Sequence, residues 1–269
     1  MNDPLGLRNI VETNPNAITQ PDHAAVERQI QQIQIKLEHS TNAQERAGLF
    51  LSKANLLRLL NRTREASEML RLALAETPND PSTQLVVDYV NGELYDDEGN
   101  SSKAYDLLSA VLAKHQTLLG LPDHRFIYEE IQRYRAFELF AMGNCENAIP
   151  LLEELLFFKS TERKSIIFAY LGNCYARSGS YEAARKCLLQ AIELGDLGDW
   201  EGQAHYDLAK TYAFMHLLSD SKREFELCAR RSVEYNLTPV KVYHWLYRVC
   251  RGLGEKGEAD RYAQLARPT

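Results

Sequence analysis

Apolar and polar residues follow the period of an α-helix along most of this chain, and the helical stretches come in pairs. In residues 169–196, apolar positions recur three and four residues apart on both sides of a turn at Gly179. Gly172 lies in the first stretch, where a better helix former would be expected, and Ala184 lies in the second. The pattern predicts two amphipathic helices that cross closely at these two small residues. At such a crossing, alanine should be tolerated at Gly172 and leucine should not.

The same offsets recur six times, which indicates a repeat. Counting from an anchor residue, each unit has a leucine, tyrosine or cysteine at +3, a turn residue at +7, and small or apolar residues at +12, +16 and +19. The turn residue is mostly glycine or asparagine, which tolerate left-handed backbone. An irregular bundle with accidentally aligned turns is the alternative, and the agreement of six copies argues against it. The six anchors are Ala54, Gly92, Ala136, Gly172, Ala209 and Tyr247.

These offsets resemble the tetratricopeptide repeat, in which a small residue, an aromatic residue, alanine, a large apolar residue, alanine and proline follow in order. The stretch YLGNCYARSGSYEAARKCLLQAIELG matches nearly throughout, and Pro78 stands at the terminal position of the first copy. The resemblance covers about residues 47–267. It implies an all-α solenoid of about six helical hairpins wound into a right-handed superhelix. The units exceed the usual length of about 34 residues, so longer helices or loops are expected.

The chain divides into three predicted segments. Residues 1–21 are rich in Asn and Pro without an apolar period, which predicts a loose N-terminal arm. Residues 22–40 form a predicted capping helix that begins after Asp22 as N-cap. The repeats fill residues 41–269. The apolar stripe of the capping helix comprises Val26, Ile30, Ile33 and Leu37.

Charge, hydropathy and cysteine content restrict the classes of function and the compartment that we expect. The formal net charge of −6 gives no support to bulk nucleic-acid binding. No run of 18 apolar residues and no secretory signal are found. The five cysteines are widely spaced and contain no C-x-x-C, which is typical of reduced thiols. We therefore expect a cytoplasmic protein without a membrane span.

No catalytic or cofactor motif occurs. The sequence lacks a phosphate-binding glycine loop, H-E-x-x-H, G-x-S-x-G and any cluster of Cys and His with metal-ligand spacing. The cysteines at core offsets behave as small hydrophobic residues. We expect no enzyme activity, no metal and no cofactor.

The resemblance implies that the first helix of each repeat lines a concave groove. Positions −6, −3, −2, +1, +4 and +5 from each anchor should face it, and basic and aromatic residues gather there in repeats three to six. Repeat two instead has Glu93, Asp96 and Asp97 there, which predicts an acidic shoulder. Ordinary solvated helix faces are the alternative explanation. The predicted peptide-binding residues are Arg133, Asn173, Arg177, Tyr206, Lys210, Lys241, Arg248 and Arg251.

The expected function is a protein-interaction scaffold or adaptor that binds an extended or helical acidic peptide segment of a partner. A ligand-responsive regulator is one alternative. Single-stranded nucleic-acid binding is another, against which the net charge argues. The resemblance also suggests a clamp for chaperone C-terminal tails. Only Asn173 and Lys241 match its five positions, so that use is disfavoured.

Overall fold

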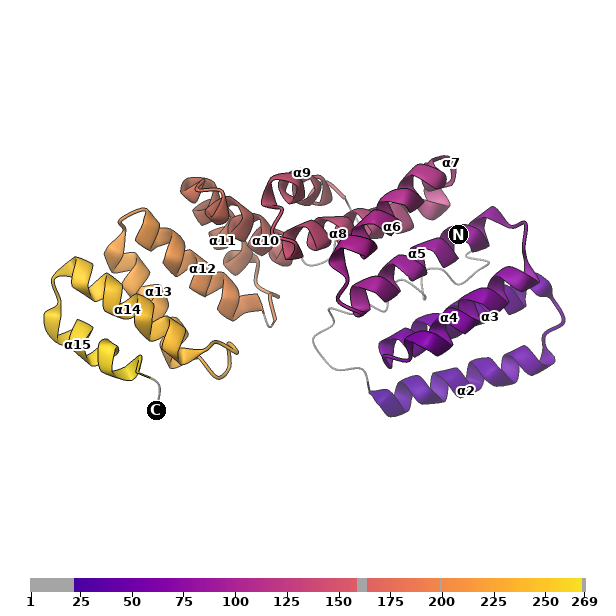
Figure 1. Ribbon diagram of the computed structural model, residues 1–269, viewed down its shortest axis with the longest axis horizontal. Coiled ribbons are helices and arrows are strands. Elements are labelled where there is room, and N and C mark those ends of the chain that lie inside the picture. The colour runs from indigo at the N-terminus through magenta and orange to yellow at the C-terminus, as the bar shows by residue number, and fades with distance from the viewer. Residues whose placement is uncertain (1–21, 159–163, 199, 268–269) are drawn as a thin grey trace. The chain divides into compact units, whose positions relative to one another are not determined.

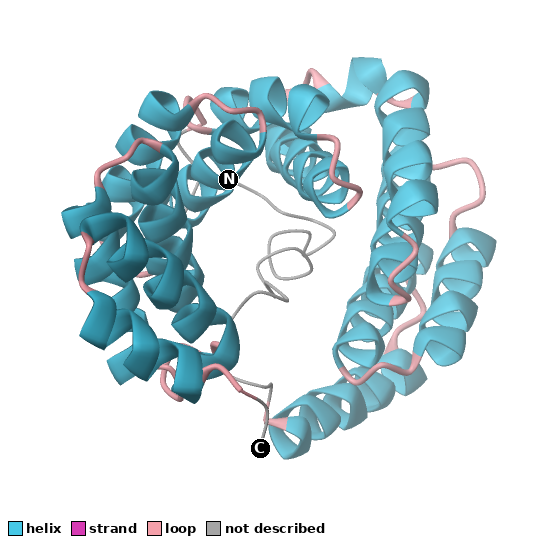
Figure 2. Cartoon of the chain, turned by 60° about the vertical axis from the view of Figure 1, so that its left-hand side comes forward, coloured by secondary structure: helices cyan, strands magenta, loops and turns pink. Residues whose placement is uncertain are grey.

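The computed structural model describes residues 22–158, 164–198 and 200–267, so the predicted arm at 1–21 lies outside the described residues. All regular secondary structure in these ranges is helical (Figures 1 and 2). The chain forms two compact units, one ending at Met142 and the other beginning at Gly143. Each unit is built from antiparallel helix pairs, as the paired apolar periods predict.

The first unit starts with α2, which spans His23–His39. Asp22 caps it by accepting a hydrogen bond from the backbone nitrogen of Ala24 at 3.0 Å. Val26, Ile30 and Leu37 of its apolar stripe are buried and Ile33 is partly buried, and the helix packs against α3 (Figure 1). The other helices of this unit are α3 (Ala43–Leu59), α4 (Thr63–Glu76), α5 (Pro81–Asp97), α6 (Ser101–Lys114), α7 (Gln116–Leu119), the 3-10 helix η1 (Pro122–His124) and α8 (Arg125–Ala141).

The second unit continues the same pattern. Within it, α10 pairs with α11, α12 with α13, and α14 with α15 (Figure 1). The helices are α9 (Cys145–Leu155), α10 (Lys164–Arg177), α11 (Tyr181–Leu194), α12 (Trp200–Phe214), α13 (Leu218–Arg230), α14 (Pro239–Leu253) and α15 (Lys256–Leu265). Five of the predicted repeats therefore correspond to two consecutive helices that pack together within one unit, whereas the helices of the third, α8 and α9, belong to different units.

The turn inside each repeat has the left-handed backbone that the +7 position predicts. All six of these residues have a positive φ, between 57° and 81°. In five turns the backbone N–H of the following residue donates to the carbonyl five residues before, as in Ser180 N to Tyr175 O at 2.8 Å. This hydrogen bond closes the end of the first helix and reverses the chain. The six residues are Asn61, Gly99, Gly143, Gly179, His216 and Gly254.

The close crossing at Gly172 is real, but its partner was predicted incorrectly. A methyl group on Gly172 would lie 2.5 Å from Leu188 Cγ and 3.2 Å from Leu188 N. Ala184 is fully buried in the same hairpin, yet Leu188 one turn later fills the space over the glycine. This contact argues against the expectation that alanine is tolerated at Gly172, because even one methyl group requires Leu188 to shift.

The longest repeat spacing has a local cause that the sequence did not reveal. Between α6 and α8 the chain forms α7 and η1, which pack against α8. These two short helices account for the extra residues between the anchors Gly92 and Ala136. The insertion adds buried Leu119 to the core of the first unit.

Candidate ligand-binding surfaces on the inner helices

The first helix of each repeat packs against the first helix of the next one within each unit. In the first unit these inner helices are α3, α5 and α8, and in the second unit they are α10, α12 and α14. Their side chains at the groove-facing offsets form three groups: a polar network, a buried aspartate with its donors, and a basic helix face.

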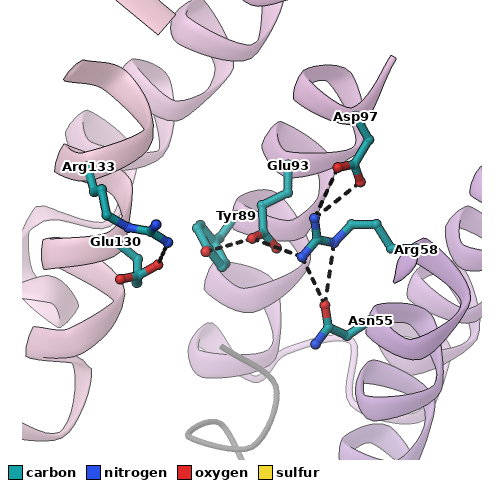
Figure 3. A network of polar contacts seen from close by, with 7 residues as sticks. All are labelled: Asn55, Arg58, Tyr89, Glu93, Asp97, Glu130 and Arg133. Carbon is teal, nitrogen blue, oxygen red and sulfur yellow. Dashed lines mark hydrogen bonds and ion pairs between the residues drawn. The ribbon is translucent and has the colours of Figure 1, made fainter. Parts of the chain in front are cut away.

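The polar network lies on α3, α5 and α8 (Figure 3). Its centre is Arg58, whose side chain is only 2% exposed. Arg58 Nη1 donates to both carboxylate oxygens of Asp97 at 3.2 Å, and its Nη2 lies 3.4 Å from Glu93 Oε1. Asn55 Oδ1 accepts from Arg58 Nε and Nη2 at 3.4 and 3.2 Å. Tyr89 Oη donates to Glu93 Oε1 at 2.9 Å. The guanidinium is thus enclosed by acceptors from two helices.

A second ion pair faces this centre from α8. Arg133 and Glu130 form a short ion pair and point toward the side of the network where Tyr89 lies (Figure 3). The Arg133 guanidinium lies 5.1 Å from the centroid of the Tyr134 ring. Tyr134 in turn makes an edge contact with Tyr89 at 6.3 Å between centroids. Two buried donors here, Arg133 Nε and Tyr134 Oη, have no hydrogen-bond partner among the residues that the structure describes.

Burial and neighbouring charges shift the pKa values of several groups in the network. Burial raises the pKa of Asp97 and of Glu130, although the neighbouring guanidinium groups of Arg58 and Arg133 oppose the shift. Burial also raises the pKa of Tyr134 well above its usual value, so its hydroxyl stays protonated. The Arg58 pKa is raised despite its burial, because Glu93 and Asp97 stabilise the charged form. Both arginines are therefore charged.

The network overturns the predicted acidic shoulder of repeat two. Glu93 and Asp97 do occupy groove-facing offsets, but both are committed to Arg58. The third acidic residue, Asp96, interacts with the buried Glu138 of α8. The sequence analysis did not predict a role for Arg58, although Asn55 and Arg58 stand at the groove-facing offsets +1 and +4 of repeat one.

In the second unit, the buried Asp207 of α12 gathers three donors. Its side chain is 4% exposed. Asn173 Nδ2 of α10 donates to Asp207 Oδ2 at 2.6 Å, Gln203 Nε2 donates to the same oxygen at 2.9 Å, and Lys210 Nζ donates to Oδ1 at 3.2 Å. The predicted site residues Asn173 and Lys210 thus meet at one carboxylate. Tyr206 lies beneath Lys210, with its ring centroid 5.5 Å from Nζ.

The third group is one face of α14. Lys241, His244, Arg248 and Arg251 are spaced by three, four and three residues, so they share one side of the helix and are all exposed. The helix contains no Asp or Glu, and Lys241, Arg248 and Arg251 form no ion pair with the carboxylates of the described chain. Its opposite side is buried in the core through Val242, Leu246, Val249 and Cys250.

Aromatic rings support this basic face. The Arg248 guanidinium lies 4.7 Å from the Trp245 ring centroid, and Trp245 is stacked on the buried Phe225 at 5.6 Å. Arg251 Nη1 donates to Tyr247 Oη at 3.1 Å. These contacts hold the guanidinium groups in place without neutralising them. Tyr247, which replaces a small anchor, is thus a partner for Arg251.

The remaining predicted residues lie apart from these contacts. Arg177 is exposed at the end of α10, where one of its guanidinium nitrogens lies 2.9 Å from the position of a Cβ atom on Gly143. Arg133 belongs to the first unit and to the polar network, whereas the other seven belong to the second unit. The structure therefore brings together Asn173, Tyr206 and Lys210, and separately Lys241, Arg248 and Arg251.

Solved structures of low sequence identity have the same architecture. Part of a TPR repeat-containing protein from Cytophaga hutchinsonii matches with a TM-score of 0.57 at 16% identity, over 91% of this chain and 94% of that chain. YrrB, described as a TPR protein with an unusual peptide-binding site, matches with 0.52 at 18%, over 72% and 89%. A Rap protein complexed with Competence and Sporulation Factor matches with 0.61 at 14%, over 98% and 76%.

The chain has the tetratricopeptide-repeat fold. No family model matches the sequence, and no curated protein matches it either. The helix packing and the recurring offsets therefore identify the fold, although the sequence identity to the solved structures is low. In a tetratricopeptide-repeat fold the three groups described above occupy the inner helices, as the groove-facing offsets predict.

The described residues contain neither a membrane-spanning helix nor a metal-binding cluster. None of the helices they contain combines the length and the apolar character needed to cross a bilayer. Nor do His, Cys, Asp and Glu come together there in groups of three or more that could hold a metal ion.

Proposed function

We propose that this protein is an interaction scaffold that binds an acidic peptide segment of a partner protein on the inner helices of its second unit. The observation that carries the proposal is the basic face of α14. Three cations that form no ion pair with any described residue lie along one exposed side of a helix that has no carboxylate. Aromatic side chains contact two of them. We place this activity in the cytoplasm, where the five free thiols would stay reduced.

Charge complementarity defines the partner. From Lys241 to Arg251 the face extends over ten residues, or about 15 Å of helix. A segment with carboxylates at similar intervals can contact several cations at once. Each exposed ion pair contributes only about 0.2–1 kcal/mol, so affinity needs several of them together with contact to Trp245. Binding of this kind weakens as salt rises, because the screening length is about 8 Å at physiological ionic strength.

The other predicted residues have supporting roles in this proposal. Lys210 uses one of its three N–H donors on Asp207, which leaves donors for a ligand. Asn173 fixes Asp207 and thereby the position of Lys210. The Tyr206 ring packs against the Lys210 ammonium group. Arg177 adds a positive charge at the end of α10.

A second candidate function is that of a regulator controlled by a bound factor. The comparison with the Rap protein supports it, because that protein was solved in complex with Competence and Sporulation Factor and matches 98% of this chain. Both candidates require a ligand on the inner helices, and they differ in whether binding changes the activity of a further partner.

The test uses a labelled peptide with glutamates spaced by three and four residues, and a matched peptide with glutamines in their place. We expect the acidic peptide alone to bind, and its affinity to fall about tenfold or more in the Arg248→Glu/Arg251→Glu variant. The control is Arg223→Glu/Arg261→Glu, which makes the same charge change at two exposed arginines on α13 and α15. Equal affinity of both variants, or preferential binding of a single-stranded oligonucleotide, would refute the proposal.

A further inference from the structure

One side of α9 is acidic and exposed. Glu146 and Glu153 lie seven residues apart, or two helical turns, so they share one side of the helix. Both glutamates are exposed, and Phe157, just after the end of the helix, is 85% exposed. The opposite side of α9 is buried and packs against α10. The α9 face, defined by these three residues, thus presents two carboxylates and an apolar ring.

The two glutamates of the α9 face are not neutralised by a described cation. The helix contains no Lys or Arg, and neither Glu146 nor Glu153 forms an ion pair with a described residue. Glu153 accepts a hydrogen bond from the Tyr175 hydroxyl, which is neutral. The helix α5 also has carboxylates and no Lys or Arg, but Glu93 and Asp97 there are paired with an arginine. The carboxylates of α9 are therefore available to an external cation.

The basic face of α14 has the matching spacing. Lys241 and Arg248 are also seven residues apart on one exposed side. In both helices the two charges therefore lie about 10 Å apart along the axis. When the two helices lie side by side and parallel, both carboxylates meet both cations at once.

The same parallel register places Phe157 beside a third cation. Phe157 follows Glu153 by four residues, and Arg251 follows Arg248 by three. When Glu153 meets Arg248, the exposed ring therefore comes next to the Arg251 guanidinium. A guanidinium stacks favourably on an aromatic ring.

The two faces belong to the same unit but cannot meet within it. α9 packs against α10, α10 packs against α12, and α12 packs against α14 (Figure 1). The intervening helices α10 and α12 hold α9 and α14 apart. The α9 face can therefore reach only the α14 face of another molecule.

We propose that the α14 face binds the α9 face of a second copy of this chain. This inference rests on the proposed function, because it uses the same basic face and names a second copy as the acidic partner. The contact joins two different surfaces, so a bound pair keeps one α9 face and one α14 face free. Association of this kind continues into open chains or closes into a ring.

The test measures association of the full chain at low salt by sedimentation velocity over a series of concentrations. Two variants reverse one face each: Glu146→Lys/Glu153→Lys on α9 and Lys241→Glu/Arg248→Glu on α14. Each variant alone should associate at least about tenfold more weakly than the wild type, because like charges then face each other. An equal mixture of the two should associate again, since each face of one variant meets an oppositely charged face of the other.

Glu182→Lys/Glu193→Lys is the matched control, because it makes the same charge change at two exposed glutamates of α11. It should associate like the wild type. The recovery in the mixture also shows that both reversed variants are folded. The proposal is overturned by a wild-type chain that stays monomeric, by a mixture that does not associate, or by a control as weak as the α9 variant.

The labelled acidic peptide separates this inference from the proposed function. The Glu146→Lys/Glu153→Lys variant keeps its α14 face, so it should bind the peptide, and excess peptide should dissociate the wild-type assemblies. Peptide binding by a chain that never associates would overturn the second copy as partner and leave the proposed function standing. Association that recovers in the mixture, without peptide binding, would support the contact between copies and refute the short peptide as a ligand.

Discussion

At the residue scale, the close approach of the two helices in a repeat depends on single small side chains. Gly172 faces Leu188, and Gly92 faces Leu108 in the same way, with a methyl group on Gly92 only 2.6 Å from Leu108 Cδ2. The sequence predicted that these positions must be small. It did not predict that the leucine at +16, and not the alanine at +12, limits the size of the side chain at the anchor. Which of the two faces the anchor depends on the rotation of each helix about its axis, and this rotation is set by tertiary packing.

Gly172→Ala should lower the free energy of unfolding by about 1–3 kcal/mol, since the added methyl group overpacks the contact with Leu188. Urea denaturation followed by circular dichroism measures the change. Gly257→Ala in α15 is the control, because a methyl group there meets no atom within 4 Å. It should be neutral or stabilising by up to about 1 kcal/mol. Two variants of equal stability would contradict the close contact.

Glu138 gives a prediction about pH. Burial, together with a hydrogen bond to Asp96, raises the pKa of Glu138 to about 8. Its protonated form stabilises the fold fully below pH 4.5, and this contribution is lost as the pH rises toward 8. Within that window the free energy of unfolding should fall by up to about 1.4 kcal/mol per pH unit.

Glu138→Gln should flatten this slope, as measured by urea denaturation at pH 5, 6.5 and 8. Glu68→Gln is the control, because Arg71 lowers the pKa of Glu68 through a hydrogen bond. Glu68 is ionised in folded and unfolded chains throughout the window and adds no slope there. A Glu138→Gln variant that keeps the wild-type slope would rule out this assignment.

At the scale of elements, polar contacts join successive inner helices in addition to apolar packing. Arg58 of α3 is bound to Glu93 and Asp97 of α5, and Asn173 of α10 is bound to Asp207 of α12. Such buried contacts fix the relative position of neighbouring helices, because a shift of one helix would leave buried charged or polar groups without their partners. The sequence placed every one of these residues at groove-facing offsets, but their pairing depends on how neighbouring repeats stack.

Arg58→Met should destabilise the first unit by about 3–5 kcal/mol, since it leaves Glu93 and Asp97 buried without a counter-charge. Thermal unfolding monitored by circular dichroism gives the comparison. Arg71→Met is the control, because Arg71 and Glu68 form an exposed pair on α4, where solvent screens the interaction and its loss should change the stability little. Arg58→Met with a wild-type melting temperature would mean that the network adds no stability.

At the scale of the whole molecule, each repeat contacts mainly its neighbours, so stability is distributed along the chain. The last core cluster joins Phe225 and Cys228 of α13 to Leu246, Val249 and Cys250 of α14. The first unit has its own core, from Val26 of α2 to Tyr134 of α8. Loss of the last repeat should therefore be a local event.

Deletion of residues 239–269 should remove the helical signal of α14 and α15, which have 15 and 10 residues, and leave the remaining helices folded. Exposure of Phe225 should make the shortened chain more prone to associate. Circular dichroism and hydrogen exchange test this, with protection of α3, α5 and α8 expected at the wild-type level. Complete loss of helical signal would show that the repeats are not independent.

The sequence by itself determined the helix pairs, the six turns with left-handed backbone and the small residues at the crossings. It did so because these features depend on local backbone preferences and on one recurring contact between neighbouring helices. Only the tertiary structure decided which charges are free. Within the described part of the chain, Arg58 is paired with carboxylates of the neighbouring helix α5 and Lys210 with Asp207 of its own helix, whereas no carboxylate forms an ion pair with Arg248 or Arg251. The same stacking leaves Tyr134 and Arg133 Nε unsatisfied, since burial and partners come from helices that are distant in sequence.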